Sequence, residues 1–183
     1  MLVRGELRGV SMDAFATLGL PRAAALDEEA VRAAYFAQSK APDADHAALN
    51  AAHELLLAPD KRLKHLIEIA APYEVKQWRT VAMSEDLMQH FLALGKVRPE
   101  AEALIEKRAK TQSALTKALL ERQTFALRDQ LEQIGFALDE KKQILETALQ
   151  AIDDWQSLIE SQAHFAYLAK WQTQVRELLL KLM

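Results

Sequence analysis

Residues that terminate or exclude helices are scarce in this chain. Among 183 residues there are only five glycines and five prolines. Alanine, leucine, glutamate, glutamine and lysine, which favour the helical conformation, recur throughout. β-branched residues, which favour strands, are few. We therefore predict an all-α protein, and the few glycines and prolines become the main indication of where one helix ends and the next begins.

The first two helices are predicted before residue 40. A short helix over 13–18 is followed by Gly19 and Pro21, a combination typical of a helix C-terminus. Asp27 is placed to cap the second helix, and the acidic residues Glu28 and Glu29 favour the positive end of its dipole.

Two further helices complete a small N-terminal module. The third covers about 45–57, and Pro59 stands at the first turn of the fourth, which runs to Ala70. Apolar side chains recur at helical spacing in all four segments, so they are expected to form one core. The positions we expect in this core are Leu18, Tyr35, Leu49, Leu56 and Leu66.

A change in composition after Ala70 predicts a linker over 74–83. The next helix is predicted over 84–95, with Ser84 as its N-cap and Gly95 at its end. It would pack beside two much longer helices as the third member of a bundle.

The two long helices are predicted to begin at Pro99 and at Asp139, with Gly135 interrupting the chain after Ile134. Because a short turn joins them, they must lie antiparallel. The predicted inward positions of the first are Ala101, Leu104, Ile105, Leu115, Leu119, Leu127, Leu131 and Ile134, and those of the second include Leu145, Ala148, Ile152, Trp155 and Ile159. The predicted organisation is a module at 1–73, a linker at 74–83 and an antiparallel three-helix bundle at 84–183.

Charge and composition argue against several classes of function. The net charge of −3 gives no electrostatic attraction to nucleic acid or to an anionic membrane. There is no cysteine, which excludes disulfides and thiolate ligation of zinc or iron–sulfur clusters. No apolar run approaches the roughly 20 residues of a membrane span, and the N-terminus has no signal-peptide core. We expect a cytoplasmic protein.

Candidate ligands and catalytic groups are also few. His46 and His53 lie seven residues apart on one helical face, and His65 is the only other candidate ligand nearby, so we expect no metal site and no cofactor. There is no glycine-rich phosphate loop and no clustered nucleophile with a base. We do not expect an enzyme.

The sequence around the first four helices resembles a J-domain. DAFATLGLPR at 13–22 is similar to the opening of that family, and VRAAY at 31–35 to its second helix. LNAAHELLLAPDKR at 49–62 is similar to the family's third helix and the turn after it, with His53 in place of a tyrosine and Ala58 in place of an aspartate. The three segments occur in the family's order.

The remainder of the chain narrows this resemblance to the HscB type of J-protein, which acts in iron–sulfur cluster assembly. DLMQHF at 86–91 is similar to the Leu-Met-rich helix after that family's linker. DWQSLIESQAHFAYLAKW at 154–171 is similar to its last helix. The resemblance implies a co-chaperone that presents a client protein to a DnaK-class chaperone.

J-domains stimulate the chaperone ATPase through a His-Pro-Asp loop and a basic second helix. The matching loop here is Ala41-Pro42-Asp43, without the histidine and about ten residues shorter, and the second helix carries only Arg32 and Lys40 as cations. The resemblance assigns these five residues to chaperone binding. The alternative is that Pro42 merely ends one helix and Asp43 caps the next.

In the same family the Leu-Met helix and an aromatic residue of the last helix grip the client. The matching positions are Leu87, Met88, Phe91 and Tyr167, whereas Leu92 and Gly95 fall where the family has glutamates. The alternative is that the helical spacing of these apolar residues marks a bundle core. Trp155 and Trp171 are expected in that core or at its edge.

Three hypotheses on function follow. The first is an HscB-like co-chaperone homologue in cluster assembly or protein folding, with ATPase stimulation doubtful because Ala41 replaces the histidine. The second is a J-like adaptor or scaffold that binds a partner through its bundle without any chaperone. The third is a hairpin protein that self-associates.

Overall fold

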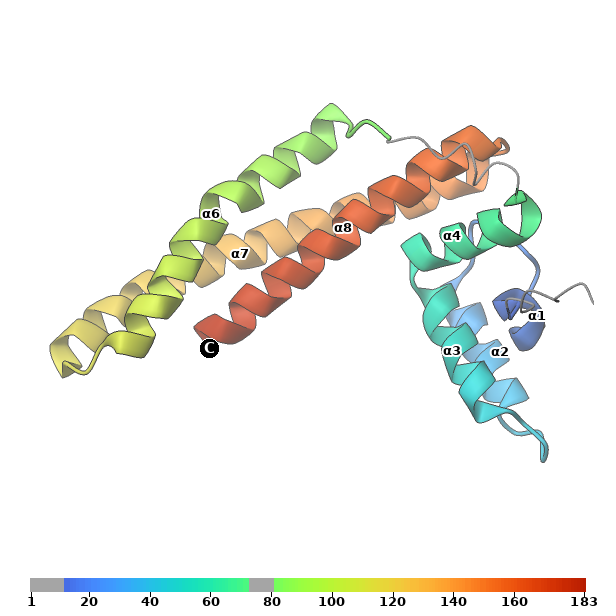
Figure 1. Ribbon diagram of the computed structural model, residues 1–183, viewed down its shortest axis with the longest axis horizontal. Helices are drawn as coiled ribbons and strands as arrows, with labels where there is room; N and C mark the ends of the chain where they lie inside the picture. The colour runs from blue at the N-terminus through green and yellow to red at the C-terminus, as the bar shows by residue number, and fades with distance from the viewer. Residues whose placement is uncertain (1–11, 73–80) are drawn as a thin grey trace, which may run out of the picture. The chain divides into compact units, whose positions relative to one another are not determined.

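The computed structural model describes residues 12–72 and 81–183, and within them every regular element is a helix (Figure 1). The prediction of an all-α fold is therefore confirmed. The chain divides into two compact units, Met1–Lys76 and Gln77–Met183. Residues 74–80 of the predicted linker lie outside the described residues.

The first unit contains four short helices among its described residues. They are α1 (Ala14–Leu18), α2 (Glu28–Gln38), α3 (His46–Leu57) and α4 (Pro59–Ala70). α3 contacts each of the other three helices. Their bounds lie within about one residue of those predicted, because each helix begins at a recognisable cap or proline.

Local chemistry fixes both ends of α1. The carboxylate of Asp13 accepts hydrogen bonds from the backbone N–H groups of Phe15 and Ala16, at 3.1 and 3.3 Å. Gly19 ends the helix with a φ of 67°, and the N–H of Leu20 closes the turn on the carbonyl of Phe15 at 2.9 Å. That φ is costly for any residue with a Cβ, so the glycine is what lets the helix stop there.

The core of this unit contains the positions that the sequence predicted. Leu18, Leu49, Leu56 and Leu66 are buried in one cluster, and the partly buried Tyr35 packs against it. The prediction is confirmed for the four leucines, whereas Tyr35 lies at the edge of the core. The other buried members are Ala14, Phe15, Val31 and Ala52.

A buried arginine ties the loop before α2 to the end of α3. Arg62 is only 2% exposed. Its Nε donates to the carbonyl of Ala24 at 3.0 Å and its Nη1 to the carbonyl of Leu56 at 2.8 Å. The guanidinium therefore satisfies one backbone acceptor in the loop before α2 and one in the last turn of α3.

The second unit is a bundle of three long helices. They are α6 (Glu85–Lys110), α7 (Ala114–Ala148) and α8 (Trp155–Leu182), and the short 3₁₀ helix η1 (Leu149–Ala151) follows α7. Each long helix packs against the other two, and the chain reverses direction at each connection (Figure 1). The guanidinium of Arg108 donates to the carbonyl of Leu182 at 2.9 Å and so joins the end of α6 to the end of α8.

The helix bounds predicted for this unit were largely wrong. α6 continues through Gly95 and Pro99, and it changes direction near its middle (Figure 1). α7 likewise continues through Gly135 and Asp139. The connections lie instead at 111–113 and 149–154, and they end at the N-caps Ser113 and Asp154. Packing along two neighbouring helices offsets the roughly 1 kcal/mol cost of an interior glycine and the larger cost of a proline.

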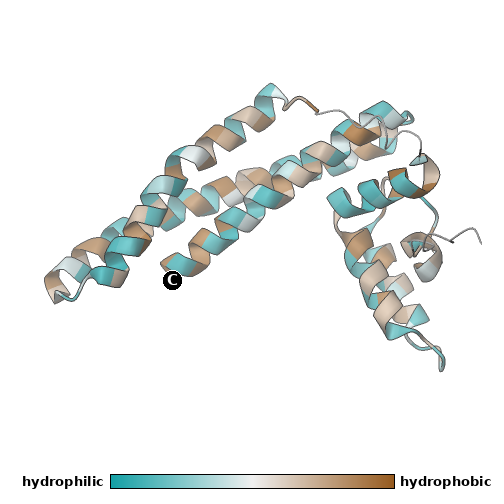
Figure 2. Cartoon of the chain, in the orientation of Figure 1, coloured by the Kyte–Doolittle hydropathy of each residue, from teal (hydrophilic) through white to brown (hydrophobic). Residues whose placement is uncertain are grey.

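The bundle core draws on all three helices, and apolar and polar residues alternate along each of them (Figure 2). Its largest fully buried side chains are Leu87, Leu131, Leu138, Leu168 and Leu182. Leu115 and Leu119, which were predicted to point inward, are 73% and 64% exposed. Leu120 is buried in their place, because α7 turns a different face to its neighbours than the predicted helix did.

Candidate functional site

The segment 39–45 forms a tight connection between α2 and α3. The N–H of Ala44 donates to the carbonyl of Ala41 at 3.2 Å, so Pro42 and Asp43 are the central residues of a four-residue turn. Pro42 suits the first central position because its φ is already near the value that such a turn requires. Ala41, Pro42 and Asp43 are all exposed.

The cap of α3 is not the residue that the sequence indicated. Asp45, rather than Asp43, caps this helix by accepting from the N–H of Ala48 at 3.0 Å. The interpretation of Asp43 as the cap was therefore wrong. Asp43 remains in the turn with its carboxylate on the surface.

The outer surface of α2 offers little positive charge. Arg32 donates to the carboxylate of Glu28 at 3.0 Å, one helical turn away. Lys40 is exposed beside the turn, and Phe36 is 62% exposed on the same helix. One of the two cations assigned to chaperone binding is thus partly neutralised within its own helix.

The α2–α3 pair is held together directly behind this turn. The hydroxyl of Tyr35 donates to Oδ1 of Asn50 at 2.6 Å, and the Tyr35 ring lies 4.5 Å from the ring of His53. The turn therefore sits at the end of two helices that are fixed to one another.

The described histidines of this unit do not form a cluster. His65 is 5% exposed, and its Nε2 accepts a hydrogen bond from the N–H of Ala14 at 3.1 Å, at the start of α1. His53 packs on Tyr35 from α3. Across residues 12–72 and 81–183, no group of three potential metal-binding side chains is present.

An apolar patch lies on α6, next to α8. Met88, Phe91 and Leu92 are 41%, 46% and 53% exposed. Leu87, the fourth apolar residue in this turn and a half, is fully buried in the bundle core. Its assignment to the client surface therefore needs correction: helical geometry turns Leu87 inward while its neighbour Met88 faces outward.

Aromatic rings from α8 support this patch. The ring of Phe91 lies 5.9 Å from that of Trp171, and Tyr167 stacks on Trp171, also at 5.9 Å. Trp171 is 4% exposed and Tyr167 is partly buried. We call Met88, Phe91, Leu92 and Tyr167 the α6–α8 patch, with Trp171 as its floor.

A groove continues the patch along α6. It has a volume of about 380 Å³ and is lined by Phe91, Leu94, Gly95, Arg98, Pro99, Glu102 and Gln174. Arg98 and Glu102 form an ion pair at 2.8 Å on its rim. The patch therefore combines an apolar centre with a polar edge, as protein-binding surfaces do.

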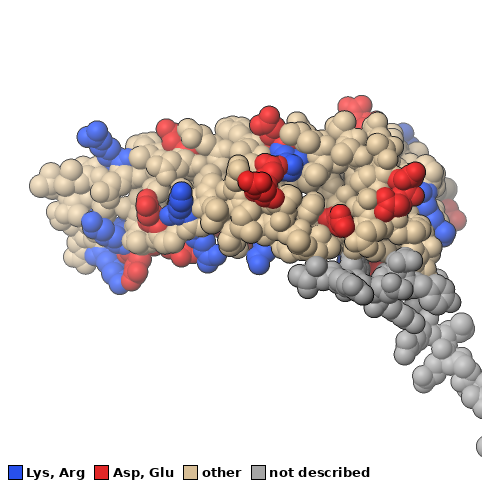
Figure 3. Space-filling model, turned by 90° about the horizontal axis from the view of Figure 1, so that it is seen from above, with Lys and Arg blue, Asp and Glu red and all other residues tan. Residues whose placement is uncertain are grey.

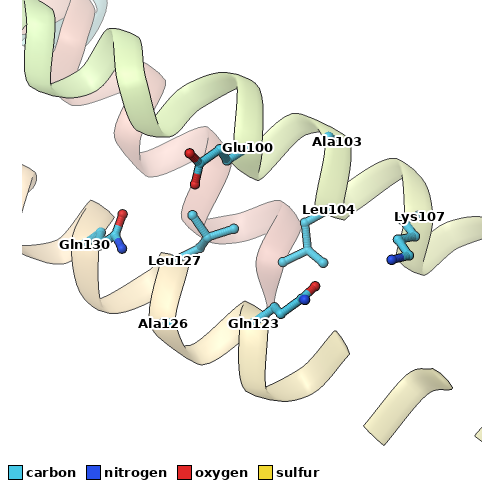
Figure 4. Close-up of a pocket in the computed structure, with 8 residues that line it drawn as sticks. All are labelled: Glu100, Ala103, Leu104, Lys107, Gln123, Ala126, Leu127 and Gln130. Atoms are coloured by element: carbon cyan, nitrogen blue, oxygen red, sulfur yellow. The ribbon is translucent and has the colours of Figure 1, made fainter. Parts of the chain in front are cut away.

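A second groove lies between α6 and α7 (Figure 4). It measures about 410 Å³, and Leu104 and Leu127 face each other across it. The remaining lining residues are Glu100, Ala103, Lys107, Gln123, Ala126 and Gln130. Its polar groups come from solvent-facing positions at helical spacing, which is the ordinary seam between two packed helices.

An ion pair joins the first turn of α6, near the patch, to α7. The ammonium group of Lys141 on α7 contacts the carboxylate of Asp86 on α6, and Nε2 of His90 lies 3.8 Å from that carboxylate. The hydrogen bond from Lys141 lowers the pKa of Asp86 below its ordinary value of 3.8, although burial acts to raise it. Asp86 thus links the helix that carries the patch to α7.

The lowered pKa of Asp86 predicts an acid-sensitive contribution to stability. A carboxyl whose pKa is lower in the folded state adds stability above its unfolded pKa and loses it as the pH falls through the folded value. We expect the difference in unfolding free energy between the wild type and Asp86→Asn to shrink as the pH falls below about 4. Urea unfolding at a series of pH values measures it, and a difference independent of pH would contradict the prediction.

The comparisons with known proteins place the chain in no family. No protein-family model matches it, and no curated protein matches it. Among the described helices, none is long and apolar enough to span a bilayer. On the face in Figure 3, acidic and basic side chains are interspersed.

One member of the α6–α8 patch, Leu92, and the floor of the patch, Trp171, were not assigned to this surface from the sequence. Leu92 was identified only as a departure from the resembled family, yet it is the most exposed of the three patch residues on α6. Trp171 was placed in the core or at its edge without its link to Phe91 and Tyr167. Leu87, Met88, Phe91 and Leu92 are too many apolar residues for the single inward face of one helical turn. This excess in the sequence could have indicated that some of them are exposed.

Proposed function

We propose that the protein is an HscB-like co-chaperone homologue that holds a client protein on its bundle and presents it to a DnaK-class chaperone. The role is in iron–sulfur cluster assembly or in protein folding. The observation that carries the proposal is the α6–α8 patch, where exposed Met88, Phe91 and Leu92 stand beside the stacked rings of α8. Methionine and aromatic side chains suit a surface that adapts to a partner.

The organisation of the first unit supports the same proposal. An exposed Pro42-Asp43 turn sits at the tip of the α2–α3 pair, and both helices are fixed behind it by the bond between Tyr35 and Asn50. In the resembled family this is the position of the loop that couples to the chaperone. Here the loop lacks the histidine, and α2 carries one arginine against two glutamates and so has a net negative charge, which weakens the coupling.

An adaptor without a chaperone partner is the second candidate. It is favoured by the ion pair between Arg32 and Glu28 and by the exposed Phe36 on α2, where the resembled family has a basic docking face. On this reading the bundle still binds a partner through the α6–α8 patch, while the first unit acts only as a folded support.

Single-turnover ATP hydrolysis by the cognate DnaK-class chaperone separates the two candidates. Clear stimulation by the wild type supports the co-chaperone. Stimulation by the Ala41→His variant but not by the wild type means that the docking surface is intact and that only the histidine is missing. Absence of stimulation by both forms means that chaperone coupling is lost, and the adaptor candidate takes its place.

The client surface is tested by titrating the cognate cluster scaffold protein in a calorimeter. We expect the double variant Met88→Ala/Phe91→Ala to weaken binding at least about tenfold, because centrally placed apolar residues dominate such interfaces. The control is Leu180→Ala on α8, which removes an apolar side chain that is also exposed, at 63%, but lies outside the patch. If the scaffold binds all three proteins equally, the patch does not hold this client.

A further inference from the structure

α7 presents apolar side chains on two opposite faces. One face packs against α6 and α8, with Leu120, Thr124, Leu127, Leu131 and Leu138 buried. The other carries five large apolar side chains that are 56–73% exposed: Leu115, Leu119, Phe125, Phe136 and Ile144. At 100° per residue these five fall within an arc of about 120°. We call them the outer stripe.

The outer stripe extends over most of the length of α7. A helix of 35 residues is about 50 Å long, and the stripe begins at its second residue and ends four residues before its last. The outward face of a bundle helix is normally polar. A line of exposed phenylalanine, leucine and isoleucine side chains along it is typical of a surface that another protein covers.

Three exposed charged side chains, Arg122, Asp129 and Glu140, lie within the same arc. Arg122 and Glu140 are both exposed, and neither forms an ion pair with another described residue. They stand nine residues on either side of Leu131. If a second α7 lay antiparallel across this face with its centre at the same residue, each Arg122 would meet the partner's Glu140, and the two-fold symmetry would form the pair twice.

The uncharged residues fit the same alignment. In it, Phe136 lies opposite Ala126 and beside Phe125 of the second copy, so a large ring meets a small side chain. Ile144 lies beside Leu119, and Asp129 lies opposite Gln133, whose amide is able to donate to the carboxylate. A parallel pairing would instead place Arg122 on Arg122 and Glu140 on Glu140, which is repulsive.

We propose that the outer stripe is the interface of a two-fold homodimer in which the α7 helices of two copies pack antiparallel. The inference is independent of the proposed function, since the stripe and the α6–α8 patch share no residue. Ten large apolar side chains, five from each copy, would be covered, which suits a contact above the roughly 1,000 Å² expected of a specific interface. The dimer would carry two client patches on one particle, which raises avidity for any multivalent partner.

Sedimentation velocity on the full chain over a wide range of concentration tests the dimer. We expect a monomer–dimer equilibrium for the wild type and a loss of at least about tenfold in association constant for Phe136→Glu. Leu180→Glu on α8 is the matched control, because its side chain is also exposed, at 63%, but lies off the stripe. A wild type that stays monomeric into the high micromolar range, or a Phe136→Glu variant that associates like the wild type, would overturn the proposal.

Charge reversal tests the antiparallel arrangement. Arg122→Glu and Glu140→Arg each place like charges opposite one another, and we expect each to weaken association about tenfold or more. The double variant restores both pairs with their signs exchanged and is expected to recover most of the loss. A double variant no stronger than the singles would reject this alignment. Circular dichroism of each variant verifies that the helices are intact.

Discussion

Replacing Arg62 by alanine is expected to destabilise the first unit by about 2–4 kcal/mol. The guanidinium is buried and donates to the carbonyls of Ala24 and Leu56. Without it, two acceptors lose a charged donor, and each hydrogen bond to a charged group contributes roughly 1.5–3 kcal/mol. The loop before α2 and the end of α3 would then separate more easily. Hydrogen exchange of the amides of α2 and α3 measures the loss within this unit.

Two further variants test whether the destabilisation by Arg62→Ala comes from the paired hydrogen bonds of the buried guanidinium. Arg62→Lys keeps the charge but has a single ammonium group in place of the planar guanidinium with its several N–H donors. It is expected to recover only part of the stability that Arg62→Ala loses. Arg22→Ala removes a surface arginine that pairs with Asp13 at 2.7 Å, and an exposed pair of this kind contributes at most about 1 kcal/mol. Equal protection factors for Arg62→Ala and the wild type would contradict the role assigned to the buried guanidinium.

Replacing Leu87 by alanine is expected to cost about 2–5 kcal/mol of bundle stability, the usual range for a fully buried leucine. The same change at Met88, the next residue along α6, is expected to change stability by less than about 1 kcal/mol, because that side chain is 41% exposed. Urea unfolding followed by the tryptophan fluorescence of the bundle measures both. The two neighbouring residues thus separate the core from the α6–α8 patch.

Client binding provides the complementary measurement. Under conditions where both variants remain folded, Met88→Ala is expected to weaken binding of the scaffold protein more than Leu87→Ala does. The opposite order would mean that the client reaches into the bundle core and that the patch is not the contact surface. Equal stability losses for the two variants would mean that α6 is rotated from the orientation described above.

The first unit was predictable because its helices are short and their ends carry local signals. Asp13, Asp27 and Pro59 each begin a helix, and Gly19 ends one at a positive φ. Such caps act within one turn of the backbone, so the neighbouring residues are enough to read them. Only the cap of α3 was misplaced, by two residues, because Asp43 and Asp45 are both suitable and the backbone of the turn selects between them.

The bundle was less predictable because its signals compete with packing over a long range. Gly95, Pro99 and Gly135 are helix breakers by local preference, yet all three lie inside long helices. In a helix of 26 or 35 residues that packs on two neighbours, contacts along the whole length outweigh one unfavourable residue. The serine and aspartate caps at Ser113 and Asp154 were the correct local signals, and the glycines obscured them.

The sequence by itself determined that the chain is helical, where the short helices of the first unit lie and which of their residues form its core. It also identified the apolar turn that contains Met88 and Phe91. Only the tertiary structure decided that Leu87 faces inward, that Trp171 joins Phe91 and Tyr167, and that α7 keeps a second apolar face exposed. The physical reason is that helical periodicity groups residues into faces, but the rotation of a helix against its neighbours decides which face is buried.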